Sequence, residues 1–137
     1  MTLIVDASVA MKWVLVEEGS EAAKQLIRTE MLAAPDFLFV ECANVLRTKR
    51  RRGQLSAEAA KEGYEILEAV PLRGVPIRQH AAAALSIAGD LEQSAYDALY
   101  LAVALAERST LVTADARFAA AALRHPIYRN SVELLGA

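Results

Sequence analysis

Two short runs of β-branched and aliphatic residues, each closely followed by an aspartate, lie near opposite ends of the chain. Thr2–Asp6 ends on an acid, and Thr110–Thr113 is followed within two residues by Asp115. Runs of this length and composition predict buried strands. The carboxyl ends of strands in open α/β sheets are where ligands bind. The sequence therefore predicts two carboxylates at the same edge of one sheet.

The residues between and after these runs predict mainly helices. Apolar spacing indicates helices over Glu18–Leu32, Phe37–Arg52, Ser56–Val70, Gln79–Ala88, Ala95–Ala106 and Ala116–Leu123. A short helix is expected to begin at Ser8, as its N-cap, and Ser20 is available to cap the next. Brief strands are expected within Pro71–Pro76 and over Ile127–Arg129. The fold class predicted is α/β, a small, mostly parallel sheet flanked by helices.

Composition restricts the class of protein and the kind of metal site. The 137 residues suit a single domain spanning 1–137, and 55% hydrophobic residues exclude a disordered chain. One cysteine and two histidines disfavour a disulfide or a zinc site, so any metal is expected to have oxygen ligands. The apolar stretch Ala98–Ala106 is too short to span a membrane, and a cytoplasmic location is expected. The net charge of −2 disfavours a general nucleic-acid binder.

Four acids occupy positions where burial is expected: Asp6, Glu41, Asp97 and Asp115. Each also has a purely structural interpretation, because Asp6 and Asp115 can cap helices and Asp97 fits a capping box with Ser94. Glu41 can lie on a half-exposed helix edge. If the four converge, their mutual repulsion requires a divalent cation such as Mg²⁺, which binds oxygen ligands and activates water at a phosphate.

Four short motifs, in order, resemble the PIN domain, and more narrowly the VapC toxins of type II toxin–antitoxin systems. They are Ile4-Val-Asp6-Ala-Ser8-Val, Glu41-x-x-Asn44-Val-Leu, Tyr96-Asp97-Ala-Leu-Tyr-Leu-Ala and Thr113-Ala-Asp115-x-x-Phe118. The likeness runs from residue 3 to about residue 128. It implies a PIN-like three-layer fold and a Mg²⁺- or Mn²⁺-dependent endoribonuclease, usually a homodimer, that a cognate antitoxin neutralises.

The resemblance also implies roles for individual residues. Asp6 and Asp97 would be the principal metal ligands, while Glu41 and Asp115 would complete the acidic pocket directly or through water. Hydrogen bonds to these acids are expected from the small polar residues beside them, which are Ser8, Asn44 and Thr113. Some PIN proteins carry a further acid near the last motif, where this chain has Ala114 and Arg117. The number of metal ions is therefore left open.

A run of cations continues the predicted helix that bears Glu41: Arg47, Lys49, Arg50, Arg51 and Arg52. It has two interpretations, a solvated helix end that favours cations or a patch that contacts RNA phosphates. Removing its five charges from the net −2 leaves −7 for the rest of the chain. The low net charge is thus interpreted as the sum of an acidic metal site and a basic strip.

Two other functions remain alternatives. One is a haloacid-dehalogenase-like phosphatase, which also begins with a strand ending in aspartate but requires a second aspartate where this chain has Ser8. The other is a catalytically silent PIN-like module that binds RNA or a partner. No nucleophile elbow, P-loop or GxGxxG motif is present.

Overall fold

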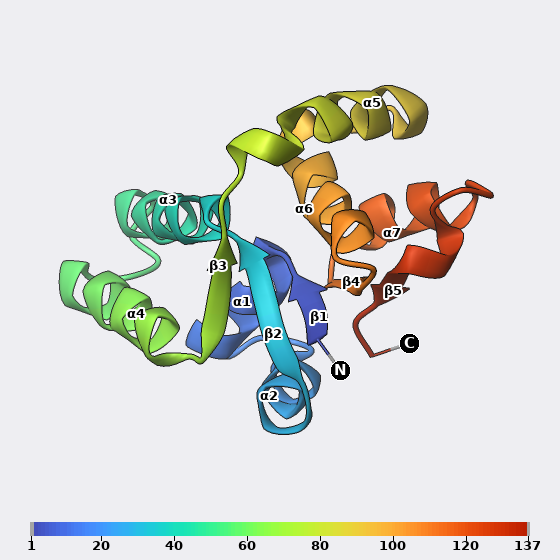
Figure 1. Cartoon of the computed structure of the whole chain (residues 1–137). Helices are drawn as coiled ribbons and strands as arrows, with labels where there is room; N and C mark the ends of the chain where they lie inside the picture. Colours follow the sequence, from blue (N-terminus) through green and yellow to red (C-terminus); the bar gives the residue numbers. More distant parts are fainter. Residues whose placement is uncertain (1, 137) are drawn as a thin grey trace.

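The sheet brings strands from the two ends of the chain together. In the computed structural model, which describes residues 2–136, the five strands follow the order β3-β2-β1-β4-β5. They are β1 (Thr2–Val5), β2 (Met31–Pro35), β3 (Leu72–Val75), β4 (Thr110–Thr113) and β5 (Val132–Leu134). Every neighbouring pair is parallel. Because β1 pairs with β4, their carboxyl ends lie side by side at one edge (Figure 1).

Helices form a layer on each face of this sheet. They are α1 (Ala7–Val14), α2 (Ser20–Thr29), α3 (Phe37–Arg51), α4 (Ala57–Ala69), α5 (Ala81–Leu91), α6 (Ala95–Ala106) and α7 (Ala116–Leu123). Crossovers between parallel strands are right-handed, so the helices before β3 and those after it lie on opposite faces. Accordingly, α1 contacts α2, α3 and α4, whereas α6 packs on α5 and on the three central strands. The predicted three-layer α/β fold is confirmed.

The core centres on α6, as the almost entirely apolar segment Ala95–Ala106 predicts. Residues 98–104 of this helix are all buried. A helix that is apolar on every side is stable only when protein surrounds it. Among residues 2–136, no helix has the length and apolar content that a membrane span requires.

The strand β2 was not predicted, and the helix predicted over Glu18–Leu32 ends at Thr29. The β2 sequence, Met-Leu-Ala-Ala-Pro, carries helix-forming alanines and no β-branched residue. Its conformation is set by tertiary context, since it lies between β1 and β3 and pairs with both. Strand propensity depends on such neighbours more than on the local sequence.

The prediction of an edge strand over Ile127–Arg129 is wrong, and the last strand begins at Val132 instead. Tyr128 in the predicted segment is buried and donates a hydrogen bond to Asp90 at 2.5 Å, which fixes this stretch as a turn. The brief strand expected within Pro71–Pro76 is confirmed as β3.

Two predicted helix caps are also wrong. Asp6, not Ser8, is the N-cap of α1, because its carboxylate accepts the Val9 N–H. Gly19, not Ser20, precedes α2, and its φ of +88° suits a residue without Cβ.

Candidate functional site

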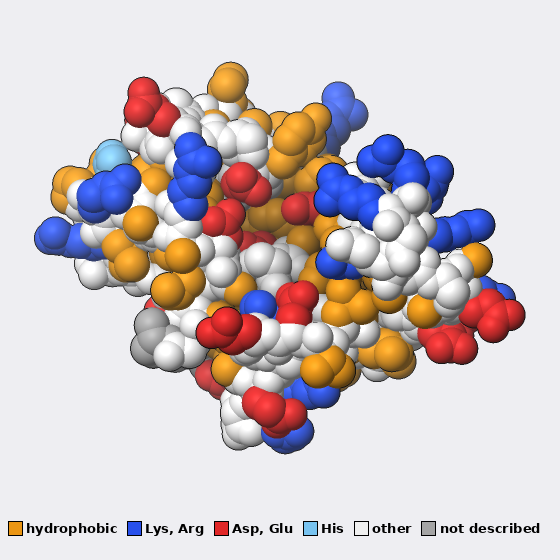
Figure 2. All heavy atoms as spheres, turned by 180° about the vertical axis from the view of Figure 1, so that it is seen from behind, with side chains coloured by type: hydrophobic (Ala, Val, Ile, Leu, Met, Phe, Trp, Pro, Cys, Tyr) orange, Lys and Arg blue, Asp and Glu red, His pale blue; other side chains and the backbone are white. Residues whose placement is uncertain are grey.

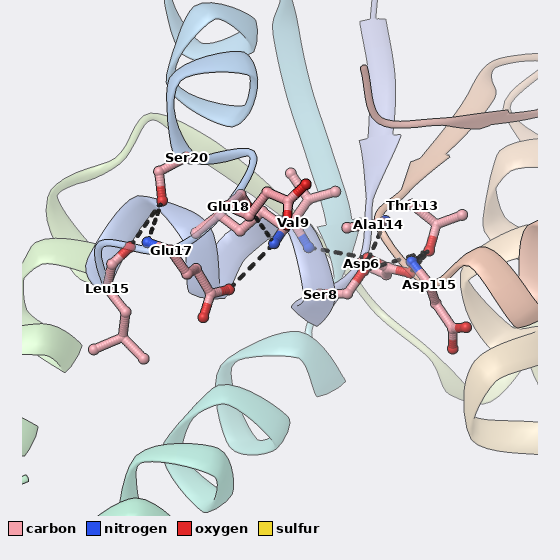
Figure 3. Close-up of polar contacts among 11 residues, drawn as sticks. Asp6, Ser8, Val9, Leu15, Glu17, Glu18, Ser20, Thr113, Ala114 and Asp115 are labelled. Atoms are coloured by element: carbon pink, nitrogen blue, oxygen red, sulfur yellow. Dashed lines mark hydrogen bonds and ion pairs between the residues drawn. The ribbon is translucent and has the colours of Figure 1, made fainter. Parts of the chain in front are cut away.

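Asp6 follows β1, and three groups donate hydrogen bonds to its carboxylate (Figure 3). Oδ1 accepts the Ser8 hydroxyl and the Val9 N–H, the latter at 3.2 Å, while Oδ2 accepts the Thr113 hydroxyl. The Ser8 hydroxyl oxygen in turn accepts the Ala114 N–H at 2.9 Å. This network joins β1, α1 and β4. Each carboxylate oxygen has two lone pairs, so Oδ2 retains one for another ligand.

Asp115 lies beside this network and caps α7. Its Oδ1 accepts the N–H groups of Arg117 and Phe118 at 3.0 and 3.1 Å, and its own N–H donates to Thr113 Oγ1 at 3.0 Å. The capping interpretation is therefore correct, and it is compatible with a place at the same strand edge as Asp6. Capping occupies Oδ1 only, so Oδ2 is free of these bonds.

Glu41 and Asp97 reach the site from α3 and α6. Both side chains are half-buried. Glu41 Oε1 accepts a hydrogen bond from the Tyr100 hydroxyl at 2.6 Å. Asp97 lies in the first turn of α6, where its N–H donates to the Ser94 hydroxyl oxygen at 3.0 Å. The predicted Ser94 cap is thus present, and it leaves the Asp97 carboxylate free of any recorded hydrogen bond within residues 2–136.

The pKa shifts show that the four acids interact. Burial raises the pKa of Asp6 above its ordinary value, its hydrogen bonds to Ser8, Thr113 and Val9 oppose that rise, and the charge of Asp115 adds to it. Burial likewise raises the pKa of Glu41, the Tyr100 hydrogen bond lowers it, and the charges of Asp6 and Asp97 raise it. Asp6 therefore lies close enough to Asp115 for repulsion, and Glu41 lies close enough to Asp6 and Asp97.

The donor set fits a cation that keeps part of its water shell. Among residues 2–136, no three Asp, Glu, His or Cys side chains lie close enough together to ligate one ion directly. Mg²⁺ is commonly bound by one or two carboxylates and retains several waters. Each of the four acids keeps at least one oxygen lone pair outside the protein hydrogen bonds described above. The set thus suits one or two direct ligands, with the remaining acids acting through water.

A cavity of about 350 Å³ lies next to the acids. Of the four acids, Glu41 lines it, together with Lys49 and the ion pair of Lys12 with Glu17, so carboxylates and ammonium groups share its walls. Figure 2 shows acidic side chains around a hollow on this face, with Lys and Arg side chains gathered along its right-hand side. The charge pattern suits a substrate that carries negative phosphates and approaches a cation.

The structure divides the basic run between two surfaces of α3. Lys49, two turns after Glu41, lines the acidic cavity, whereas Arg47 and Arg50 line a groove between α3 and α4 that also contains Lys61. Arg51 and Arg52 are exposed at the helix end. The five cations therefore do not form one patch, and Lys49 is the member beside the acids.

The hydrogen bond expected from Asn44 to one of the acids is absent among the described residues. The Asn44 side chain is exposed. Val45 and Lys49, four and eight residues after Glu41, line the cavity instead. Ser8 and Thr113 do contact Asp6, as expected.

Sequence reasoning missed Tyr100 and Lys12. Tyr100 is a buried residue of α6 whose hydroxyl donates a hydrogen bond to Glu41. Its position three residues after Asp97, on the same helix face, was the available signal. Lys12 follows Ser8 by one helical turn and lines the cavity beside Glu41. Burial raises the pKa of Cys42 to about 12, so this thiol is unsuited to nucleophilic chemistry.

The comparisons with known proteins identify the family of the chain. A family model for the PIN domain matches residues 3–123. The chain is 34% identical over 115 residues to ribonuclease VapC9 of Mycobacterium tuberculosis, which covers 84% of this chain and 87% of that protein. The chain belongs to the VapC branch of the PIN-domain family. A VapC ribonuclease of Mycobacterium bovis matches this PIN domain to the same extent.

Solved structures share the fold of this PIN domain at lower identity. VapBC2 of Rickettsia felis, bound to a fragment of its promoter DNA, aligns with a TM-score of 0.70 and 15% identity over 98% of each chain. VapC20 of Mycobacterium tuberculosis, a toxin that cleaves the sarcin–ricin loop, aligns with a TM-score of 0.65 and 18% identity over 87% of this chain and 94% of its own.

The raised pKa of Asp6 predicts how stability depends on pH without metal. Because the folded chain holds the Asp6 proton more tightly than the unfolded chain does, the stability that this proton contributes is complete below the ordinary pKa of 3.8. It is lost as the pH rises through the folded-state pKa. In EDTA, the free energy of unfolding in urea should therefore fall more steeply from about pH 4 to about pH 7 for wild type than for Asp6→Asn.

Glu58→Gln, which removes an exposed acid from α4, controls for net charge. Parallel curves for wild type and Asp6→Asn would contradict the electrostatic account of the site.

Proposed function

We propose that this PIN domain, as a single unit over residues 1–137, is a divalent-metal-dependent endoribonuclease and the toxin component of a type II toxin–antitoxin system. The observation that carries the proposal is a group of four acids in which Asp6 repels Asp115 and Glu41 repels Asp6 and Asp97, next to a cavity lined by Glu41 and two lysines. Repulsion of this kind favours binding of a cation. The ribonuclease names of the VapC relatives support RNA as the substrate.

The four acids have two different roles in the proposed metal site. Asp6 and Asp97 are the principal ligands, because Asp97 has no competing hydrogen bond recorded in residues 2–136 and Asp6 is fixed in place by Ser8 and Thr113. Glu41 and Asp115 complete the pocket directly or through water. Mg²⁺ or Mn²⁺, when bound, supplies an activated water and stabilises negative charge on the scissile phosphate.

Cleavage of RNA tests this assignment. Asp6→Asn and Asp97→Asn should each lower the rate of Mg²⁺- or Mn²⁺-dependent cleavage by at least about a hundredfold. Mutation of a residue that only hydrogen-bonds a metal ligand already lowers metal affinity or activity by about 10- to 100-fold. Asp90→Asn, which alters an acid bonded to Tyr128, serves as the control and should retain activity.

Equal rates in wild type, Asp6→Asn and Asp97→Asn, or cleavage that EDTA leaves unchanged, would contradict the proposal. Binding of cation and RNA without turnover would instead support the alternative, a catalytically silent PIN-like module.

Lys49 is proposed to contact an RNA phosphate near the acids, and Arg47, Arg50, Arg51 and Arg52 to contribute along the same helix. Among the five cations, Lys49 is the one that lines the same cavity as Glu41. Contacts of this type orient a nucleic acid without reading its sequence. The cations therefore supply affinity, and the acids supply the chemistry.

Salt dependence measures this contact. Neutralising all five cations should weaken RNA binding and flatten its dependence on salt. Lys49→Ala alone should reduce the slope of log K against log salt by about 0.7, the value for one phosphate contact on a single strand. Arg28→Ala, on the exposed surface of α2, should leave the slope unchanged. An unchanged slope in the fivefold variant would exclude the basic strip as an RNA contact.

A cognate antitoxin is the proposed protein partner. The structural relatives include the VapBC2 complex of Rickettsia felis and a toxin–antitoxin complex from Klebsiella pneumoniae, which aligns with a TM-score of 0.59 and 17% identity over 82% of this chain and 86% of its own. We expect the antitoxin gene in a small reading frame adjacent to or overlapping this one. Co-expression of its product should abolish cleavage, and a product that neither binds nor inhibits the chain would contradict this partner.

A second copy of the chain is the other proposed partner, through an apolar face of α5 and α6. Leu85 and Tyr96 are 72% and 66% exposed on this face. The Tyr96 ring stacks on Phe37 at 5.2 Å between centroids, next to an apolar cavity of about 370 Å³. Exposed apolar surface of this kind marks an interaction site, and a twofold dimer buries the same patch on both copies.

Sedimentation analysis tests this face. Leu85→Glu places a charge in the proposed interface and should convert a dimer into a monomer. Ile66→Glu, at a 47% exposed position on α4, should leave the dimer intact. A monomeric wild type, or a Leu85→Glu variant that stays dimeric, would contradict the proposed dimer.

A further inference from the structure

Tyr100 connects the core helix α6 to an acid on another helix. Its side chain is 1% exposed, and its hydroxyl lies 2.6 Å from Glu41 Oε1. An ionised carboxylate only accepts hydrogen bonds, so the phenol is the donor. Bonds of a hydroxyl to a carboxylate are shorter and stronger than those between neutral groups. The contact therefore joins α3 to α6 directly at the acidic site.

No other hydrogen bond to the Glu41 carboxylate is recorded among residues 2–136. A glutamate side chain has several rotatable bonds, and ordering it costs conformational entropy. Without the phenol, packing alone would fix Glu41 on a half-buried face. The Tyr100 hydroxyl bonds to Oε1 and leaves Oε2 without a protein donor. Because the bond at Oε1 orients the carboxylate, Oε2 is held in a defined direction in which it can accept a bond from a cation or its water.

We propose that Tyr100 is a positioning residue that holds Glu41 in the orientation in which it contributes to the cation site. The inference rests on the proposed function, because it concerns how one acid of that site is held. Asp97 and Tyr100 lie one turn apart on α6. This helix thus sets the place of two of the four acids, Asp97 directly and Glu41 through the phenol.

The chain contains a matched control for the loss of a buried phenol hydroxyl. Tyr128 is 5% exposed, and its hydroxyl donates to Asp90 at 2.5 Å. Tyr100→Phe and Tyr128→Phe each keep the ring and remove one hydroxyl–carboxylate bond. Any general effect of losing a buried hydroxyl is common to both variants. Only Tyr100→Phe also removes a bond to an acid of the proposed metal site.

The experiment is calorimetric titration of the metal-free full-length chain with Mn²⁺. Tyr100→Phe should raise the dissociation constant about tenfold, the lower end of the effect of removing a hydrogen-bond partner of a metal ligand. Tyr128→Phe should leave it within about twofold of wild type, as expected for a change outside the ligand environment. In a Glu41→Gln background, Tyr100→Phe should raise the dissociation constant for Mn²⁺ by less than about twofold further. A residue that acts through Glu41 has no independent effect once Glu41 is replaced.

The outcomes separate this inference from the proposed function. A wild type that does not bind Mn²⁺ would overturn both. Normal Mn²⁺ binding by wild type together with an unchanged dissociation constant in Tyr100→Phe would overturn only the role of Tyr100. An equal loss in Tyr128→Phe, or an undiminished loss in the Glu41→Gln background, would also overturn it.

A measurement on wild type does not depend on whether Tyr100→Phe folds. The ¹³Cζ resonance of a tyrosine reports on the hydrogen bond of its hydroxyl. Addition of Mg²⁺ should shift this resonance for Tyr100 and leave that of Tyr128 in place. A Tyr100 resonance that does not respond to saturating Mg²⁺ would overturn the proposed role.

Discussion

The hydrogen bonds to the Asp6 carboxylate connect the fold to the site. Asp6 follows the central strand β1, caps α1 through the Val9 N–H, and receives the Thr113 hydroxyl from β4. Because β1 pairs with both β2 and β4, this one side chain lies where the two halves of the sheet meet. Its structural role and its proposed chemical role do not compete. The bonds that cap α1 and join β4 also fix the direction of the carboxylate.

Hydrogen bonds and repulsion act on the acids in opposite directions. Donors from Ser8, Thr113 and Val9 lower the pKa of Asp6, but burial and the charge of Asp115 outweigh them. The same balance holds at Glu41, where Tyr100 supplies the favourable bond. The protein thus orients its acids without fully compensating their charge. We propose that a divalent cation supplies the missing compensation, and the uncompensated charge is what favours metal chemistry in this proposal over an acid that works alone.

The parts of the fold that were predictable are those in which local pattern and tertiary context agree. The bounds of β4, α6 and α7 coincide with the predicted ones, since β-branched runs and apolar helices are consistent with the places they occupy. The strand β2 was missed because its alanines favour a helix and only pairing with β1 and β3 makes them a strand. The four acids were selected as candidates because acids at buried positions are costly, and their roles stay predictions. The proposed roles of Tyr100 and Lys49 depend on which side of a helix faces the site, and this depends on tertiary packing.

We propose that Asp6 and Asp97 hold a divalent cation, with Glu41 and Asp115 completing its surroundings. Anomalous scattering from crystals grown with Mn²⁺ tests this most directly, because the signal locates the ion itself. The account predicts a peak in contact with Asp6 Oδ2 and the Asp97 carboxylate. An ion bound elsewhere on the chain, or no peak at saturating Mn²⁺, would contradict it.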